Sequence, residues 1–228
     1  MLKNKSYIGI SFIILIFGIY AIPKIIDRVQ KDEIVKGDRL DKVSNSSKED
    51  GELIKMGVAP KFEFINQDNV KISNETYKGK VYVLEFFFTS CPSICPKMNQ
   101  SMLVIENTFF GNPNFGIVSI SIDPEHDTPA VLKAHAKLLG VKSSSWNFLT
   151  GDKTAIYDLA NKGFNVYVGE NHKVKGGFEH SGLFALIDKK GYIRCRKDDY
   201  GNPILYYDGL DKKGVRNIQQ DIAILLKE

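Results

Sequence analysis

Apolar and polar positions divide this chain of 228 residues into three parts. A charge-free apolar run, Tyr7–Ile22, follows two lysines, and residues up to 26 extend it to about the 20 residues that a bilayer requires. This predicts a short cytoplasmic stub and transmembrane anchor over 1–26. The charged stretch over 27–57 has almost no aromatic residues and predicts a solvated tether. From Val58 onward, short apolar blocks alternate with turn signals, which predicts a folded domain over 58–228.

Several blocks in the third part have the pattern of strands. Alternation on both sides of a turn at 67–69 indicates a β-hairpin at the start of the domain. Two nearly continuous apolar runs, Val81–Phe88 and Asn114–Ile122, are typical of strands buried on both faces of a sheet. Shorter strands are expected at 146–150, at 181–188 and, after a Lys-Lys-Gly turn, at 192–197.

Helical patterns separate these strands. Apolar positions recur every three or four residues after Cys95, and Thr128, Pro129 and Gly140 are suited to cap, begin and end a second helix. Further helices are expected over 152–164 and 212–228. The order of hairpin, β, α, β, α, β, α, β, β, α predicts a three-layer α/β/α fold with crossover helices on the sheet.

The start of the chain indicates how the domain is placed. The apolar run is long for a signal peptide and no small-residue cleavage site follows it, so an uncleaved anchor is expected. Lys3 and Lys5 predict a cytoplasmic N-terminus. The protein is therefore expected to cross the inner (cytoplasmic) membrane once, with its domain on the periplasmic or extracytoplasmic side. The formal net charge is +4, and no basic cluster is interleaved with aromatic residues, so a nucleic-acid partner is not expected.

The candidate chemistry lies in the segment FFFTSCPSICPKMN, which carries Cys91 and Cys95 between the first buried strand and its helix. This placement suggests a thioredoxin-like fold and puts a thiol at a helix N-terminus, where the thiolate is favoured. The i, i+4 spacing would place both thiols on one helical face. The pair could form a stabilising disulfide, act as a redox couple, or bind a soft metal such as Cu(I). The third cysteine, Cys195, is expected to point inward as an unreactive apolar residue.

Histidines offer a third metal ligand. His135 falls inside a predicted helix and is expected at the surface or in packing, while His126 and His172 fall in loops. His180 directly precedes the strand at 181–188, and in thioredoxin-like folds the loop that enters this strand faces the dithiol. His180 is therefore the predicted ligand.

Three acidic residues stand out, and two of them, Glu85 and Asp123, allow two interpretations. Glu85 is the lone acid in its apolar strand; burial would raise its pKa and allow it to accept a proton from a thiol, whereas a polar edge would leave it unremarkable. Asp123 and Asp127 follow a buried strand and could satisfy turn and cap donors, or Asp123 could lie near the metal.

Three blocks resemble the Sco/SenC family of membrane-anchored copper proteins: FFFTSCPSICPKM, SISIDPEHDTP and HSGLFALIDKKGYIR. The resemblance extends from about Val58 to the C-terminus. It implies copper, as Cu(I) or Cu(II), bound by Cys91, Cys95 and His180. It also implies a role in maturing the dinuclear copper centre of a haem–copper (cytochrome c) oxidase, whose copper-accepting subunit would be the partner. The segment 195–209 is longer than usual for the family.

Two main functions remain open from the sequence, and a peroxide-scavenging or redox-sensing relative is a third, weaker alternative. The first is a copper metallochaperone that is not an enzyme; because a disulfide cannot coordinate copper through the same sulfurs, it would need a thiol–disulfide reductant as a second partner. The alternative is a membrane-anchored thiol–disulfide oxidoreductase that reduces a copper-accepting client. There Cys91 would attack, Cys95 would resolve, and Glu85 would serve as the proton acceptor.

Overall fold

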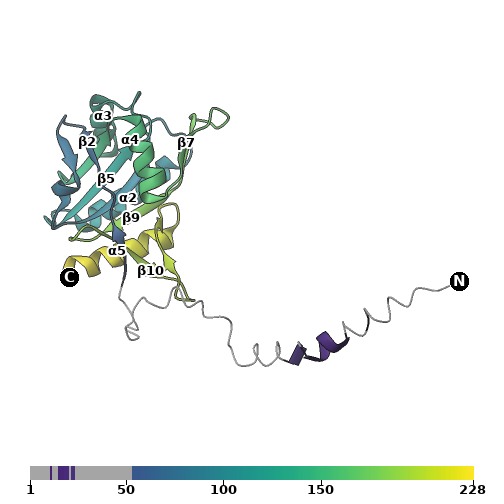
Figure 1. Ribbon diagram of the computed structural model, residues 1–228. Coiled ribbons are helices and arrows are strands. Elements are labelled where there is room, and N and C mark those ends of the chain that lie inside the picture. Colours follow the sequence, from purple (N-terminus) through teal and green to yellow (C-terminus); the bar gives the residue numbers. More distant parts are fainter. Residues whose placement is uncertain (1–10, 12–14, 21, 24–52) are drawn as a thin grey trace. The chain divides into compact units, whose positions relative to one another are not determined.

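The computed structural model describes residues 11, 15–20, 22, 23 and 53–228 (Figure 1). The chain divides into two units, Met1–Asp50 and Gly51–Glu228. Among the described residues, no helix combines the length and the apolar character needed to span a bilayer. Most of the predicted anchor (1–26) and most of the predicted tether (27–57) lie outside the described residues.

The second unit alternates strands and helices in the predicted order and adds several short strands. Its strands are β1 Ile54–Val58, β2 Glu63–Asn66, β3 Lys71–Ser73, β4 Val81–Phe87, β5 Phe115–Ser121, β6 Trp146–Thr150, β7 Val168–Glu170, β8 Phe178–His180, β9 Leu183–Ile187, β10 Tyr192–Lys197, β11 Pro203–Ile204 and β12 Tyr207–Asp208. Its helices are α2 Cys95–Phe109, α3 Pro129–Leu139, α4 Lys153–Asp158 and α5 Lys212–Lys227, with a 3₁₀ turn η1 Asn74–Tyr77 and a π-helical turn η2 Leu159–Phe164.

The main sheet has the strand order β1-β10-β9-β4-β5-β6-β2-β3, with β11 beside β10 and β12 beside β9 (Figure 1). β4, β5 and β6 are parallel, whereas β9 runs antiparallel to β4. The crossovers through α2 and α3 advance in the same direction across the sheet, so right-handed connections place both helices on one face. Because β4 and β9 are antiparallel, the segment that follows β4 and carries Cys91 lies beside the segment that precedes β9 and carries His180.

Side chains of β4 show that both faces of the sheet are covered. The ring of Phe87 lies 5.6 Å from that of His135 in α3, and the ring of the preceding Phe86 lies 6.1 Å from that of Phe164 in η2. Because successive strand residues point to opposite faces, helical segments cover the sheet from both sides. The predicted three-layer α/β/α arrangement is confirmed, as are the hairpin turn at 67–69 and the caps of α3 at Thr128 and Gly140.

Three local features differ from the prediction. Residues 54–57, which the sequence assigned to the tether, belong to β1, which pairs antiparallel with β10. A separate hairpin, β7–β8, was not predicted, and His180 is its last residue rather than a loop residue. The long segment 195–209 forms the end of β10, then β11 and β12.

The start of α2 corrects the expectation for the two thiols. The helix begins at Cys95 and has Pro96 in its first turn, a position where proline is tolerated. Cys91 therefore lies in the turn between β4 and α2, not one turn earlier on the same helical face. The turn, rather than helical spacing, brings the sulfurs together.

Candidate metal centre

Cys91, Cys95 and His180 come together at the end of β4. Nε2 of His180 lies 3.2 Å from Sγ of Cys95 and 3.9 Å from Sγ of Cys91. All three atoms lie within 4.8 Å of one another, and no other group of three His, Cys, Asp or Glu side chains in the described part of the chain is arranged to hold a metal ion. Both cysteines are buried free thiols. The structure thus brings the three predicted ligands together.

The imidazole of His180 is held with its free nitrogen toward the sulfurs. Its Nδ1 lies 3.2 Å from the carbonyl oxygen of Ser181, which can only accept a hydrogen bond. Nδ1 therefore carries the ring proton, and Nε2 keeps a lone pair that faces Cys91 and Cys95. The ring also packs edge-on against Phe88, with 5.6 Å between centroids. These contacts set both the tautomer and the orientation that a metal ligand requires.

The β7–β8 hairpin covers one side of the thiols. A Cβ atom on Gly176 would lie 2.8 Å from Cδ of Pro92, and the residue has φ +100°. Only glycine allows the hairpin to approach the Cys91 turn this closely. Next to the loop that carries Gly176, the hairpin is held by Lys153, which pairs with Glu170, the last residue of β7, and, at 3.2 Å, with Glu125. The hairpin that carries His180 is thus fastened over one flank of the site.

The two thiols are electrostatically unequal. A hydrogen bond from the Cys95 thiol, with a smaller contribution from Ser93, lowers the pKa of Cys91 to about 3 against the effect of burial. The same bond, together with burial, raises the pKa of Cys95. At neutral pH the pair therefore holds one thiolate at Cys91 and one proton at Cys95. A thiolate of this kind is both a nucleophile and a soft-metal ligand.

Glu85 lies buried in β4, as one of its two interpretations predicted. Burial raises the pKa of its carboxyl to about 7. Oε1 accepts a hydrogen bond of 2.7 Å from Ser119, whose hydroxyl in turn accepts one of 2.9 Å from the indole of Trp146. Oε2 has no partner. The charge of Glu85 contributes to the raised pKa of Cys95, so the carboxyl is electrostatically linked to the dithiol.

Asp127 organises the Cys91 turn, in agreement with the expectation that it satisfies turn donors. Its fully buried carboxylate accepts hydrogen bonds from the backbone N–H of Thr89 at 3.0 Å, from the Thr89 hydroxyl, and from the Ser121 hydroxyl at 2.5 Å. His126 adds a contact through Nδ1 at 2.9 Å. The turn-donor interpretation thus holds for Asp127. The sequence signal for this role was the position of Asp127 in DPEHDTP, after a strand that neighbours β4.

The remaining candidates lie outside the metal cluster. Asp123 does not belong to the metal cluster. Its backbone N–H donates a hydrogen bond of 3.1 Å to the Ser121 hydroxyl. His135 packs between Phe87 and Phe148, and His126 is exposed on the loop before α3. Cys195 is fully buried opposite Ile54 of β1, and burial raises the pKa of its thiol to about 11. It is placed as an inward-facing thiol, as predicted.

Comparison with known proteins gives matches over the folded unit. The SCO1/SenC family model matches residues 52–211. A SCO1 protein homolog of Bacillus subtilis is 34% identical over 138 residues, which are 58% of this chain and 69% of that protein. The solved structure of BsSco, described as a member of the Sco family of cytochrome c oxidase assembly proteins, is 27% identical, with TM-score 0.65 over 79% of this chain and 99% of that one. Yeast Sco1 with copper bound is 25% identical, with TM-score 0.56 over 74% and 90%. These likenesses extend over the thioredoxin-like α/β domain.

Proposed function

Because this chain belongs to the SCO1/SenC family, we propose that it is a copper carrier that loads the copper-accepting subunit of a haem–copper oxidase. The proposal is carried by one observation: two sulfurs and one imidazole nitrogen lie within 4.8 Å of one another. The copper found in yeast Sco1, and the assembly role in the description of BsSco, agree with it.

The donor set suits copper in both oxidation states. Thiolates favour the soft ion Cu(I), and imidazole also suits Cu(II). Cys91 supplies a thiolate at neutral pH, and Cys95 would release its proton when both sulfurs bind the ion. Nε2 of His180 needs no proton loss, because the ring proton is on Nδ1. Copper is the cargo here, and binding and release are the work of the protein.

Titration of copper into reduced variants tests the ligand set. Cys91→Ser and Cys95→Ser should each abolish stoichiometric binding, whereas His180→Ala should retain weakened Cu(I) binding and lose stable Cu(II) binding. Cys195→Ser is the matched control for a buried thiol and His172→Ala for an imidazole; both should bind as the wild type does. A Cys91→Ser variant that still bound one copper ion tightly would refute the proposed site.

A thiol–disulfide oxidoreductase is the second candidate, favoured by the unequal thiols. The Cys91 thiolate would attack a client disulfide and release one client thiolate; Cys95, after losing its proton, would then attack the mixed disulfide and release the second. The client gains two electrons, and the protein is left with a Cys91–Cys95 disulfide that a separate thiol reductant must open. His180→Ala distinguishes the candidates: an oxidoreductase should keep exchange and client maturation, whereas a three-ligand carrier should lose maturation.

The placement of the domain outside the cytoplasm is also a proposal. It is supported by Lys3 and Lys5 before the charge-free run Tyr7–Ile22. Reporter fusions after Gly57 should be active on the exported side of the membrane. Activity of the same fusions in the cytoplasm would reverse the proposed orientation.

A further inference from the structure

The β7–β8 hairpin needs support from outside itself. It is a two-stranded sheet apart from the main sheet, and each of its strands has three residues. An isolated hairpin of this kind is at best marginally stable in water. Its last residue, His180, faces Val168 across the pair of strands. The position of the imidazole at the sulfurs therefore depends on contacts between the hairpin and the rest of the domain.

The side-chain amide of Asn161 binds the outer edge of β7. Its Nδ2 donates a hydrogen bond of 3.0 Å to the carbonyl oxygen of Val168, and its Oδ1 accepts one of 3.1 Å from the N–H of the same residue. In an antiparallel sheet, both backbone groups of a residue point to the same side. The amide therefore occupies the place that a third strand would take, and it holds the backbone directly opposite His180.

The hydrogen bonds between β7 and β8 agree with this arrangement. The N–H of Asn171 donates a hydrogen bond of 2.8 Å to the carbonyl oxygen of Gly177. Hydrogen-bonded and non-hydrogen-bonded pairs alternate along an antiparallel ladder, so Val168 and His180, three pairs further on, form a non-hydrogen-bonded pair. The Cα atoms of such a pair are about 4.5 Å apart, closer than those of a hydrogen-bonded pair. A displacement of Val168 would therefore also displace His180.

Asn161 is itself held on the sheet by the π-helical turn η2. The last residue of η2, Phe164, is buried, and its ring packs edge-on against that of Phe86 in β4, with 6.1 Å between centroids. Turns of this kind are frequently found at functional sites. Because β4 also leads to Cys91, the turn connects the strand that positions the thiols with the hairpin that carries the imidazole.

The other contacts of the hairpin restrain it less. Lys153 pairs with Glu170, but both side chains are partly exposed, and exposed ion pairs contribute little to stability. Phe178 and His180 pack against the ring of Phe88, with 5.2 and 5.6 Å between centroids. Apolar contacts are non-directional, so these rings do not fix the hairpin along the strand direction. The pair of hydrogen bonds from the η2 amide does.

We infer that Asn161 is a positioning residue for His180: its amide fixes Val168 and thereby holds Nε2 of His180 at 3.2 Å from Sγ of Cys95. The inference rests on the proposed function, in which the imidazole matters most for Cu(II). Without the amide, the hairpin would be free to move away from the thiols. The two sulfurs would remain, and they suit Cu(I). Asn161 thus sets whether the site holds copper in both oxidation states.

The test compares Asn161 with another amide that binds a strand in the same way. Gln67 donates a hydrogen bond of 3.3 Å to the carbonyl oxygen of Trp146 and accepts one of 2.9 Å from the N–H of Phe148. Trp146 begins β6, whereas the thiols follow the end of β4, which runs in the same direction. Gln67 therefore lies towards the opposite edge of the sheet, and Gln67→Ala is the matched control.

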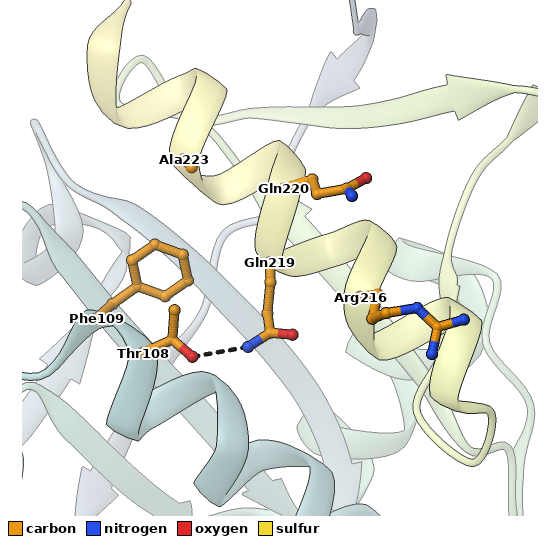
Figure 2. Close-up of a pocket in the computed structure, with 6 residues that line it drawn as sticks. All are labelled: Thr108, Phe109, Arg216, Gln219, Gln220 and Ala223. Atoms are coloured by element: carbon orange, nitrogen blue, oxygen red, sulfur yellow. Dashed lines mark hydrogen bonds between the residues drawn. The ribbon is translucent and has the colours of Figure 1, made fainter.

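A second control removes an amide at the surface. Gln219 donates an exposed hydrogen bond of 2.7 Å to the hydroxyl of Thr108, across a hollow between the end of α2 and α5 (Figure 2). This bond joins two side chains and holds no strand. Gln219→Ala therefore shows the effect of losing an amide hydrogen bond alone.

Three measurements on the full chain separate positioning from general support. Competition titrations give the affinities for Cu(I) and Cu(II), and pulsed electron paramagnetic resonance detects an imidazole nitrogen bound to Cu(II). Hydrogen–deuterium exchange of the reduced, metal-free protein reports on the hairpin. The variants are Asn161→Ala, the milder Asn161→Asp, which keeps the acceptor for the Val168 N–H, and Asn161→Ala combined with His180→Ala. Asn161→Asp replaces the alanine variant in every comparison if that variant does not fold.

Asn161→Ala should keep the stoichiometry of Cu(I), bind Cu(II) at least about tenfold more weakly, lose the imidazole signal and exchange faster over 166–180. Loss of a group that orients a metal-binding histidine typically weakens metal binding by about 10–100-fold. Asn161→Asp should lie between alanine and wild type. In the His180→Ala background, Asn161→Ala should cause no further loss of Cu(I) affinity, because it acts through the imidazole. Both glutamine controls should keep the wild-type affinities and the imidazole signal.

Wild-type Cu(II) affinity and an unchanged imidazole signal in Asn161→Ala, despite faster exchange of the hairpin, would overturn the inference. The same losses in Gln67→Ala, or a further loss of Cu(I) affinity in the double variant, would also overturn it, since either would indicate a general loss of stability. A wild type that binds no copper, and whose hairpin still exchanges faster after Asn161→Ala, would instead refute the proposed function and leave the contact between Asn161 and Val168 in place.

Discussion

Replacement of Asp127 by alanine should loosen the turn that carries Cys91. The substitution removes the acceptor for the backbone N–H of Thr89 and for the hydroxyls of Thr89 and Ser121, all in a buried setting. Hydrogen bonds to a charged group contribute about 1.5–3 kcal/mol each. The hydroxyls can rotate to other acceptors but the backbone N–H cannot, so we expect a loss of about 3 kcal/mol rather than the full sum.

Urea unfolding of a reduced chain that begins at Gly51, followed by circular dichroism, measures this loss. With a slope of about 2 kcal/mol/M, the midpoint should fall by about 1.5 M at an unchanged slope. Asp127→Asn keeps the size and part of the hydrogen bonding, and should lie between alanine and wild type. Asp199→Asn changes an exposed carboxylate and should stay within about 0.5 kcal/mol. If Asp127→Ala were as stable as this control, the carboxylate would not organise the turn.

Three further predictions concern buried charge and the domain edge. Burial raises the pKa of Glu85 from 4.5 to about 7, so the folded state binds this proton more tightly than the unfolded state does. The free energy of unfolding should therefore be highest below pH 4.5 and fall by about 3 kcal/mol towards pH 7, at about 1.4 kcal/mol per pKa unit. Glu85→Gln should flatten that dependence in urea titrations at several pH values, and an unchanged slope would assign it elsewhere. Arg194→Met should lower the free energy of unfolding by about 3–5 kcal/mol, because Asp188, 3.1 Å from the guanidinium, would remain as a buried charge without its partner. A loss no larger than that of Lys162→Met, which breaks an exposed pair with Asp158, would contradict this prediction. A chain that begins at Ala59 lacks β1 and the buried Leu53. Compared with a chain that begins at Gly51, it should be less stable by about 2 kcal/mol and should associate more readily through the exposed edge of β10. Equal melting temperatures and sedimentation of the two chains would show that β1 is dispensable.

The parts of the fold that were predictable are those whose signals are local. Val81–Phe87 and Phe115–Ser121 are nearly continuous apolar runs, and Pro129 and Gly140 bound α3 with residues that act through their own backbone. The parts that were missed depend on a distant partner. β1 has a weak alternation and is a strand because β10 offers it an edge. β7 and β8 have three residues each, too few for a periodic signal.

The candidate site was predictable to the level of residues but not of geometry. Cys91 and Cys95 stand out by composition, and the expected strand after His180 placed it near them. Spacing alone suggested one helical face, whereas the turn with Pro92 delays the start of α2 to Cys95.

The pairing of β4 with β9 has a consequence for the order in which the site is built. His180 is 85 and 89 residues from the two cysteines along the chain, whereas the cysteines are separated by a single turn. Contacts this distant in sequence form late in folding, since the long loop between them must first close. During synthesis, both thiols are present in the chain before His180 has been added and can become their neighbour. A metal ion that bound the chain early in folding would be held by the two cysteine sulfurs alone. The His180 nitrogen would join them once β9 had paired with β4.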